Sequence, residues 1–171
     1  MRFARIATAF ALTATLTLGS ASAPLSAANA QRPKSPLKFW EGRTESTGTV
    51  KLLMKKPFKS HAVGIGTIRS DGSLHLVQHV TEPDKAPFDR VWHIREVAPG
   101  RYSGTMSQAS GAVTIDEVDG KFRFRFRMKG NLSVEQWLYP SKDWNSARNE
   151  VTIRKFGVVV GRSEGIVRKA R

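Results

Sequence analysis

The chain has 171 residues, of which 40% are hydrophobic and 25% are charged, a composition typical of one globular domain and unlike that of a disordered or membrane-embedded chain. Lysine and arginine number 28 against 14 acidic residues, giving a formal net charge of +14. The chain has no cysteine, which excludes disulfides, thiol catalysis, thiolate metal sites and acylation at a lipoprotein cysteine.

The first 30 residues have the features of an export signal. A short basic start precedes an uncharged apolar run over 6–18, and small-x-small sites follow at 21–23 and 28–30. Because Pro24 would lie directly after the first site, we expect cleavage after Ala30. The run is shorter than the ~20 residues that a membrane-spanning helix needs. We expect a periplasmic or secreted protein, whose formal charge falls from +14 to +12 once the two arginines of the signal are removed.

The remainder of the chain is predicted to form one all-β domain over 37–171, after a polar, proline-containing segment at 31–36. Short stretches of alternating apolar and polar residues recur between turn residues, which is typical of antiparallel strands. The expected strands are 49–56, 61–69, 73–81, 90–97, 101–106, 112–118, 121–129, 132–139, 150–156 and 166–169.

Turn residues between the expected strands favour sequential hairpins. Asp71-Gly72 and Asp119-Gly120 are typical two-residue turns, since both central residues of a type I′ turn have positive φ, and Gly130-Asn131 is expected to form a third. Residues 82–89 form a longer loop, and 143–148 is the one candidate for a short helical turn. Short strands must hide their edges. Because nearly every connection is tight, we predict a single antiparallel up-and-down β-barrel rather than a Greek-key sandwich.

The clearest alternation runs over 121–129. The apolar residues of this stretch share one strand face and its five cations share the other. The cationic face has two interpretations: a solvated outer surface that discourages aggregation, which we favour, or a docking stripe for an anionic partner such as lipid headgroups or polysaccharide. Nucleic acid fits poorly, because the aromatics and the cations point in opposite directions. The residues of this predicted anionic-partner surface are Lys121, Arg123, Arg125, Arg127 and Lys129.

A few polar groups are candidates for the barrel interior. Gln78 shares a face with apolar neighbours, and Glu135 would lie opposite Phe126 if Gly130-Asn131 were a two-residue turn. There the carboxylate would need an arginine partner or a raised pKa, whereas a bulge would turn it into water. Polar groups among aromatics are typical of a ligand pocket, and equally of a satisfied core. The predicted interior ligand-binding residues are Gln78, Trp92, Phe122, Phe124, Phe126, Glu135 and Trp137.

No catalytic constellation emerges from the sequence. Residues 161–165 match the G-x-S-x-G pattern, but neither an acid nor a histidine follows them, so we interpret the match as chance. His75 and His79 share a strand face about 13 Å apart, too far to share one metal. We therefore expect no enzyme, no metal site and no cofactor.

Several stretches resemble an uncharacterised family of exported bacterial proteins. They are similar to the Domain of Unknown Function 3833 family, whose members often carry lipoprotein signals. The resemblance covers most of 39–169; it implies a secreted single domain and no activity, and the strand order is similar to lipocalin or calycin barrels. The matching residues are Phe39-Trp40-Glu41-Gly42-Arg43-Thr44 with Gly48, Arg90-Val91-Trp92, Gly100-Arg101-Tyr102-Ser103-Gly104, Trp137, and Asn149 with Lys155-Phe156-Gly157-Val158.

The chain departs from the pattern of that family at three places. Family members tend to carry acidic residues where this chain has Gln78, Ser107-Gln108 and Glu135-Gln136. If those acids form a polar interior site, the resemblance implies that this chain has partly lost it. The lipid-anchored cysteine is also missing.

These observations predict an exported, soluble, lipocalin-like barrel that binds a small amphipathic or lipid-like anionic ligand in its interior. A basic rim would favour the anionic head. The alternative is an envelope interaction protein that docks its cationic strand face on anionic lipid or glycan. We expect neither nucleic acid binding nor a membrane-spanning segment, and the oligomeric state stays open.

Overall fold

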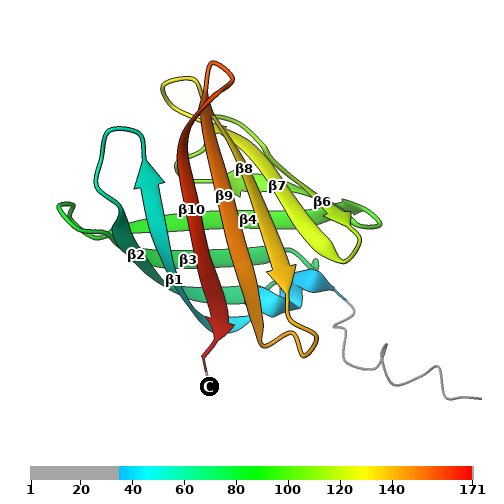
Figure 1. Ribbon diagram of the computed structural model, residues 1–171. Helices are drawn as coiled ribbons and strands as arrows, with labels where there is room; N and C mark the ends of the chain where they lie inside the picture. The colour runs from blue at the N-terminus through cyan, green and yellow to red at the C-terminus, as the bar shows by residue number, and fades with distance from the viewer. Residues whose placement is uncertain (1–34, 171) are drawn as a thin grey trace, which may run out of the picture.

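The computed structural model describes residues 35–170 and shows one closed barrel of ten antiparallel strands (Figure 1). Each strand pairs with its neighbours in the chain, and β10 pairs with β1 to close the sheet. This order confirms the predicted all-β, up-and-down barrel. The strands are β1 Gly42–Leu52, β2 Phe58–Ile68, β3 Leu74–Thr81, β4 Phe88–Ala98, β5 Arg101–Met106, β6 Val113–Val118, β7 Lys121–Met128, β8 Leu132–Pro140, β9 Ser146–Lys155 and β10 Val158–Lys169.

Strand β7 shows how the period of two in the sequence becomes the two faces of the barrel wall. Its three phenylalanines are buried, whereas the cations between them face outward. Asp119 and Gly120 have φ values of 51° and 73°, the positive values of a type I′ turn. The turn therefore pairs Val118 with Lys121, as predicted.

A short 3-10 helix, η1 (Pro36–Trp40), closes one end of the barrel. Ser35 caps it, because its hydroxyl accepts a hydrogen bond from the backbone N–H of Leu37. Pro36 stands in the first turn, where its fixed φ suits a helix start and no N–H is wasted. Leu37, Phe39 and Trp40 are buried in the barrel. The helix was not predicted from the sequence.

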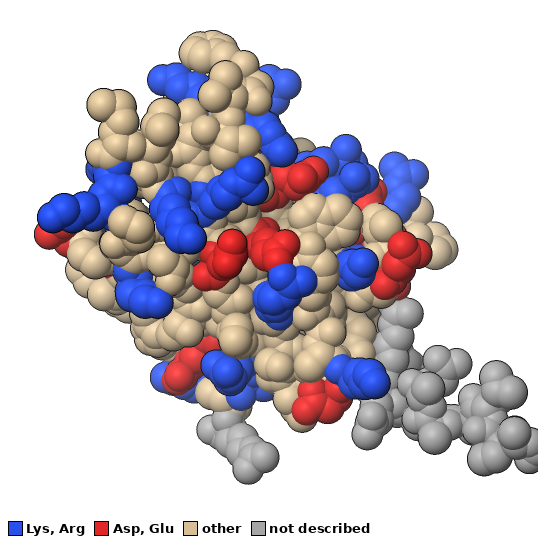
Figure 2. All heavy atoms as spheres, viewed as in Figure 1, with Lys and Arg blue, Asp and Glu red and all other residues tan. Residues whose placement is uncertain are grey.

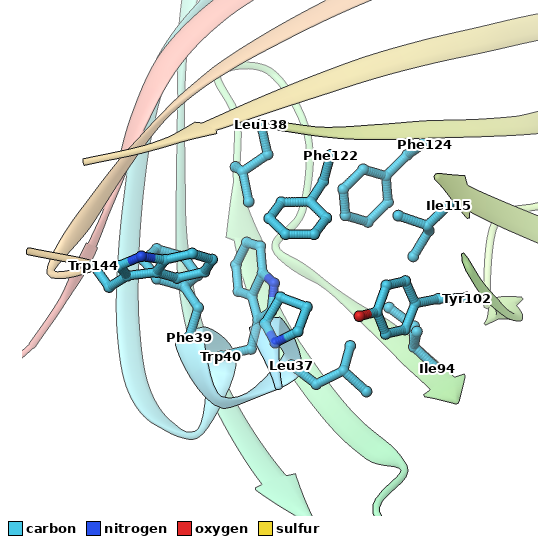
Figure 3. A pocket seen from close by; sticks show the side chains of 11 residues that line it. Leu37, Phe39, Trp40, Ile94, Tyr102, Ile115, Phe122, Phe124, Leu138 and Trp144 are labelled. Atoms are coloured by element: carbon cyan, nitrogen blue, oxygen red, sulfur yellow. The ribbon is translucent and has the colours of Figure 1, made fainter. Parts of the chain in front are cut away.

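The closed end is tightly packed around η1 (Figure 3). Phe39 meets Trp40 edge-on at 5.1 Å between ring centroids, and Trp144 of the β8–β9 loop meets Phe122 at 6.1 Å. The gap that these side chains leave measures only about 20 Å³, roughly the room that one water molecule needs. Gly66 of β2 completes the contact: a Cβ there would lie 1.9 Å from the carbonyl oxygen of Trp40.

Five loops surround the opposite end of the barrel (Figure 1). No helix among residues 35–170 covers this end, since η1 is the one helix described and it lies at the other. We call it the open end. Its loops are 53–57, 82–87, 107–112, 129–131 and 156–157.

The predicted strand boundaries are wrong at β1, β9 and β10. β1 begins at Gly42 and ends at Leu52, seven residues before the predicted start and four before the predicted end. Its polar residues lack an apolar alternation, yet Thr44 is only 2% exposed. β9 begins at Ser146 and β10 at Val158, both earlier than predicted. The start of β10 was misplaced because its glycines resemble turn residues while lying inside the strand.

Two turn predictions are also wrong. Residues 143–148 form no helix: the Asp143 carboxylate accepts hydrogen bonds from the Ser141 hydroxyl and the backbone N–H of Asn145, so a turn leads straight into β9. These bonds favour the ionised form and lower the pKa of Asp143. Asp71-Gly72 lies in a five-residue loop, since Ile68 already pairs with Leu74.

The predicted signal peptide, 1–30, and residues 31–34 lie outside the described residues. Cleavage and export therefore stay predictions. Over residues 35–170, η1 is far too short to cross a bilayer, and no other helix is available to do so.

The contact between Gly66 and η1 is testable by adding one methyl group. We expect Gly66→Ala to lower the free energy of unfolding by about 2–3 kcal/mol, because the new Cβ overlaps the backbone of η1. Thr67→Ala, on the exposed face of the same strand, is the control and should change it by less than about 0.5 kcal/mol. Urea titration followed by tryptophan fluorescence measures both. Equal stabilities would show that η1 does not rest on Gly66.

Candidate functional site: a cavity inside the barrel

A cavity of about 570 Å³ lies inside the barrel, between η1 and the open end. Trp40 contributes to its wall at the closed end, and Glu82 and Lys85 of the β3–β4 loop contribute at the open end. Packed interiors have few voids larger than a water molecule, whereas ligand pockets measure about 300–1,000 Å³. The cavity is therefore of ligand size, and its loop residues give it a mouth at the open end.

Aromatic rings of β4 and β7 form much of the cavity wall. Trp92 meets Phe124 and Phe126 edge-on, with ring centroids 6.3 and 5.9 Å apart. All three rings are at most 9% exposed and line the cavity. Edge-on contacts of this kind hold rings in fixed orientations, so this part of the wall is a firm apolar surface.

Two pairs of polar side chains interrupt the apolar wall, and each pair satisfies itself. The indole N–H of Trp92 donates to the Gln78 side-chain oxygen at 2.8 Å. Across the cavity wall, the Gln136 amide donates to the Asn149 side-chain oxygen at 2.9 Å. All four residues line the cavity. These bonds remove the cost of burying the groups that they join.

Arg90 of β4 stands in this wall without an ion pair among the described residues. Its Nε is buried and has no hydrogen-bond partner there, and the same holds for the Gln108 side-chain oxygen. Desolvation lowers the pKa of Arg90, an effect that the charge of Glu82 partly opposes. The Glu82 carboxylate itself is bonded to Lys85 at 2.5 Å. The cavity therefore holds a partly desolvated positive charge that no neighbouring carboxylate neutralises by contact.

Most of the predicted interior residues do face inward. Gln78, Trp92, Phe124 and Phe126 line the cavity. Phe122 is also buried, but it lies at the closed end against η1 rather than in the cavity wall (Figure 3).

The predicted interior position of Trp137 is wrong, and for Glu135 the structure has the alternative, outward position in place of the interior one. Residues 129–131 form a three-residue loop, so Met128 pairs with Leu132 and Glu135 lies opposite Arg125. One residue more in the loop than predicted exchanges the two faces of β8. It brings Gln136 into the cavity in place of its neighbours.

On the outer face, Trp137 takes part in a stack of aromatic and cationic groups. Its ring lies 6.2 Å from that of Tyr139, and the Arg123 guanidinium lies 5.7 Å from its centroid. Tyr139 donates a hydrogen bond to Glu150 at 3.0 Å. The tryptophan therefore shields an arginine on the outside of the barrel instead of contacting a ligand inside it.

The five cations of β7 and its following loop, called the cationic stripe below, occupy the outer face as predicted. Asp116 lies 2.7 Å from Arg125 and 3.5 Å from Arg123, so one carboxylate engages two of the five charges. Beside the stripe, an open groove of about 470 Å³ is lined by Arg125, Arg127, Arg154 and Glu135, among others.

The predicted interior ligand-binding residues did not include Arg90, Gln108 or Gln136, although the family resemblance had marked Gln108 and Gln136 as positions of a possible polar interior site. A signal existed for Arg90, because positions 90 and 92 share a strand face and Trp92 was placed inside. For the other two the resemblance was the signal, and their positions in the structure depend on loop geometry. Gln108 lies in the β5–β6 loop, and Gln136 is brought inside by the length of the β7–β8 loop.

The candidate residues for catalysis or metal binding do not assemble into a site. Residues 161–165 lie within β10 and pair with both β1 and β9, so the strand–turn–helix context of a nucleophile elbow is missing. Over residues 35–170, no three His, Asp or Glu side chains come together as a metal site.

Comparisons with known proteins place the chain in a family. The family described as "Protein of unknown function (DUF3833)" matches residues 14–169, which is most of the chain. Among the curated proteins, none matches this chain.

Solved structures share the fold at low sequence identity. An S-type phycobiliprotein lyase, CPES, from Guillardia theta aligns with a TM-score of 0.62 and 8% identity, covering 79% of this chain and 90% of that one. Rv2717c from M. tuberculosis gives 0.59 and 12%, covering 80% and 99%. A protein of unknown function from the DUF3598 family of Nostoc punctiforme gives 0.55 and 10%, covering 81% of this chain but 51% of that one. These likenesses confirm the lipocalin-like, calycin type of barrel.

The bond between Gln78 and Trp92 allows a test of the interior. We expect Gln78→Leu to lower the free energy of unfolding by about 1–3 kcal/mol, because the buried indole N–H loses its acceptor. Glu135→Gln, on the outer face, should change it by less than about 0.5 kcal/mol. Thermal unfolding measures both variants. A Glu135→Gln protein that loses more stability than Gln78→Leu would contradict the pairing of Glu135 with Arg125 on the outer face.

Proposed function

We propose that this chain, which belongs to the DUF3833 family, binds a small amphipathic or lipid-like ligand with an anionic head inside its barrel. The observation that carries the proposal is a cavity of about 570 Å³ whose wall holds Arg90 without an ion pair. A cavity of this size suits an acyl chain or a small ring system. The wall also combines apolar rings with a few oriented polar groups, which is the usual make-up of a ligand site.

The charge of the cavity supports an anionic head. Glu82 is the one carboxylate in the described cavity wall, and Lys85 already binds it. No carboxylate of the described residues therefore contacts Arg90, whose guanidinium lies 5.9 Å from the centroid of the Phe88 ring, and a carboxylate or phosphate would give it charge-assisted hydrogen bonds. The unpartnered oxygen of Gln108 needs a donor, which a hydroxyl of the ligand or a bridging water supplies.

The position of Arg90 also suggests how the ligand lies. Arg90 is the third residue of β4, whose first residue follows an open-end loop, and it pairs with Gln78 across the strands. Trp92 and Ile94 follow on the same face, further from the mouth. A head at Arg90 would lie near the open end, and an apolar tail would extend over Trp92 toward Phe124.

One fold neighbour is named as a lyase, so this type of barrel is compatible with catalysis as well as with binding. Binding is favoured for this chain because the cavity and the unpaired cation account for a ligand without requiring a reacting group. We further propose that the protein acts in the periplasm or outside the cell, on the strength of the predicted signal over 1–30.

The test separates the charge of the ligand from its apolar body. We expect Arg90→Leu to weaken dodecanoate binding about 10- to 100-fold, which corresponds to the loss of a charged hydrogen bond worth about 1.5–3 kcal/mol. Binding of dodecanol, which has the same chain and no charge, should change little. Both titrations are followed by the change in tryptophan fluorescence that a ligand causes beside Trp92 in the cavity.

Arg125→Gln, on the outer face, is the matched control and should leave both affinities unchanged. The thermal stability of Arg90→Leu should equal or exceed that of the parent, because a desolvated charge without a partner is removed. Equal losses for dodecanoate and dodecanol would reject the anionic head. Native mass spectrometry of protein purified gently from its producing cell then identifies the class of any ligand that co-purifies, and a bare protein there with no binding of either probe would reject the binding role.

The outer groove beside the cationic stripe favours a second candidate function, docking on an anionic envelope glycan. In that case Arg123→Gln, Arg125→Gln and Arg127→Gln together should abolish binding to alginate, and raising the salt concentration should weaken it in the parent, since exposed charges are screened within about 10 Å at 0.1 M. The control combines Arg69→Gln, Arg95→Gln and Arg168→Gln, which remove the same amount of charge from other parts of the surface. This variant should keep its binding to alginate. Alginate binding that survives both the stripe substitutions and high salt would exclude the stripe.

A further inference from the structure

We propose that the open end of the barrel docks on an anionic lipid bilayer through two apolar loop tips. The first tip is Leu53 and Met54 of the β1–β2 loop, and the second is Phe156 and Val158 at the β9–β10 turn. We call them the rim tips. The four residues of the rim tips belong neither to the cationic stripe nor to the cavity wall, although Arg154, beside the second tip, also lines the groove next to the stripe. The inference goes beyond the proposed ligand.

The rim tips expose apolar side chains to an unusual degree. Leu53, Met54, Phe156 and Val158 are 65%, 97%, 77% and 65% exposed. Single exposed apolar residues need no explanation, but a group of large ones on one part of a surface marks an interaction site. Figure 1 shows both loops projecting from the same end of the barrel. The backbone links them, because the N–H of Leu53 donates to the carbonyl of Val160 at 2.9 Å.

The backbone conformation at both tips adds to the free-energy cost of placing large apolar residues there. Met54 has φ 62° and Phe156 has φ 49°, in the left-handed region that bulky side chains disfavour. Asparagine or glycine would suit each position better and would expose no apolar surface. Neither folding nor solubility therefore accounts for a methionine and a phenylalanine at these two places, whereas a surface into which they insert does.

The charge around the rim tips identifies that surface. Segments 51–59 and 153–162 contain Lys51, Lys55, Lys56, Lys59, Arg154, Lys155 and Arg162, and they contain no acidic residue. On the face shown in Figure 2, the β9–β10 tip is uncharged at its end and has lysine or arginine on either side. Large apolar side chains flanked by lysines match a bilayer interface, where the apolar groups enter the acyl boundary and the ammonium groups reach anionic headgroups.

The remainder of the open end sets the orientation. The acidic residues at this end lie in and beside the β3–β4 loop: Glu82 is bonded to Lys85, Asp89 to His79, and Asp84 is exposed. These carboxylates would be repelled by an anionic surface. The barrel should therefore tilt, with the rim tips toward the bilayer and the β3–β4 loop away from it.

Flotation with vesicles of phosphatidylcholine, with or without phosphatidylglycerol, tests the apolar part of the proposal. We expect the parent to bind the mixed vesicles, and Met54→Asn with Phe156→Asn to weaken that binding about tenfold or more, because each large side chain loses its burial. The same substitutions should keep or raise the melting temperature, since asparagine tolerates positive φ. This stability readout separates lost docking from lost folding.

Ile65→Thr with Val97→Thr is the matched control, because it removes two exposed apolar side chains from other parts of the barrel surface. It should leave vesicle binding unchanged. The parent failing to bind the mixed vesicles, or both double variants binding as the parent does, would overturn the proposal.

The charged part has its own matched pair. Lys55→Gln, Lys56→Gln and Lys155→Gln together should remove the preference for phosphatidylglycerol, whereas Lys38→Gln, Arg69→Gln and Lys142→Gln, near the closed end, should not. Loss of the preference in both triples would indicate net charge rather than a docking surface. Arg90→Leu should bind vesicles like the parent, so failure of the interior ligand and failure of docking give different results. If the combined Arg123→Gln, Arg125→Gln and Arg127→Gln substitutions abolished vesicle binding while Met54→Asn with Phe156→Asn retained it, the rim tips would be rejected as the docking surface.

Discussion

Closure of the sheet by the pairing of β1 with β10 is the interaction on which the rest of the structure depends. Nine residue pairs join the two strands, so the barrel has no free strand edge. The strands meet closely at Gly48 and Gly165, where a Cβ on Gly165 would lie 2.8 Å from the Cα of Gly48. Once the sheet is closed, the period of two places every strand residue inside or outside. The enclosed space must then be filled by side chains or left to a ligand.

The two ends of the barrel meet that requirement differently. At the closed end, η1 brings Leu37, Phe39 and Trp40 against the aromatic residues of β7 and the β8–β9 loop, and about 20 Å³ is left. Between η1 and the mouth, the inward residues in the middle of β1 and β2 are small, among them Ser46, Ser60 and Ala62, and about 570 Å³ is left. The cavity is thus a consequence of small residues on one part of the wall, not of a barrel too wide to fill.

The parts of this structure that the sequence predicts are those with a local cause. The faces of β7 follow from strict alternation, and the Asp119-Gly120 turn follows from backbone conformation. β1 and β10 were misplaced because their inward residues are small or polar, which leaves no apolar alternation to detect. Gln78, Trp92, Phe124 and Phe126 were placed by parity along a strand, whereas Glu135 depended on whether a loop has two residues or three. One additional loop residue exchanges the inward and outward faces of the entire following strand, and loop length depends on geometry that strand alternation does not reveal.

The features that cost the fold stability gather toward the open end. An arginine without an ion pair, a large void, and bulky apolar residues exposed at positive φ each oppose folding. The closed end has capped, packed and buried groups, and the one bulky side chain at positive φ among its described residues, Trp144 with φ 56°, packs against Phe122 instead of standing in water. Residues that oppose folding are typical of functional sites, because there the requirements of function outweigh those of stability. We therefore expect the functional site of this protein at the open end. The proposed anionic ligand in the cavity and the proposed docking of the rim tips concern this same end, and together they would describe a protein that takes up or releases an amphipathic anion at a lipid surface.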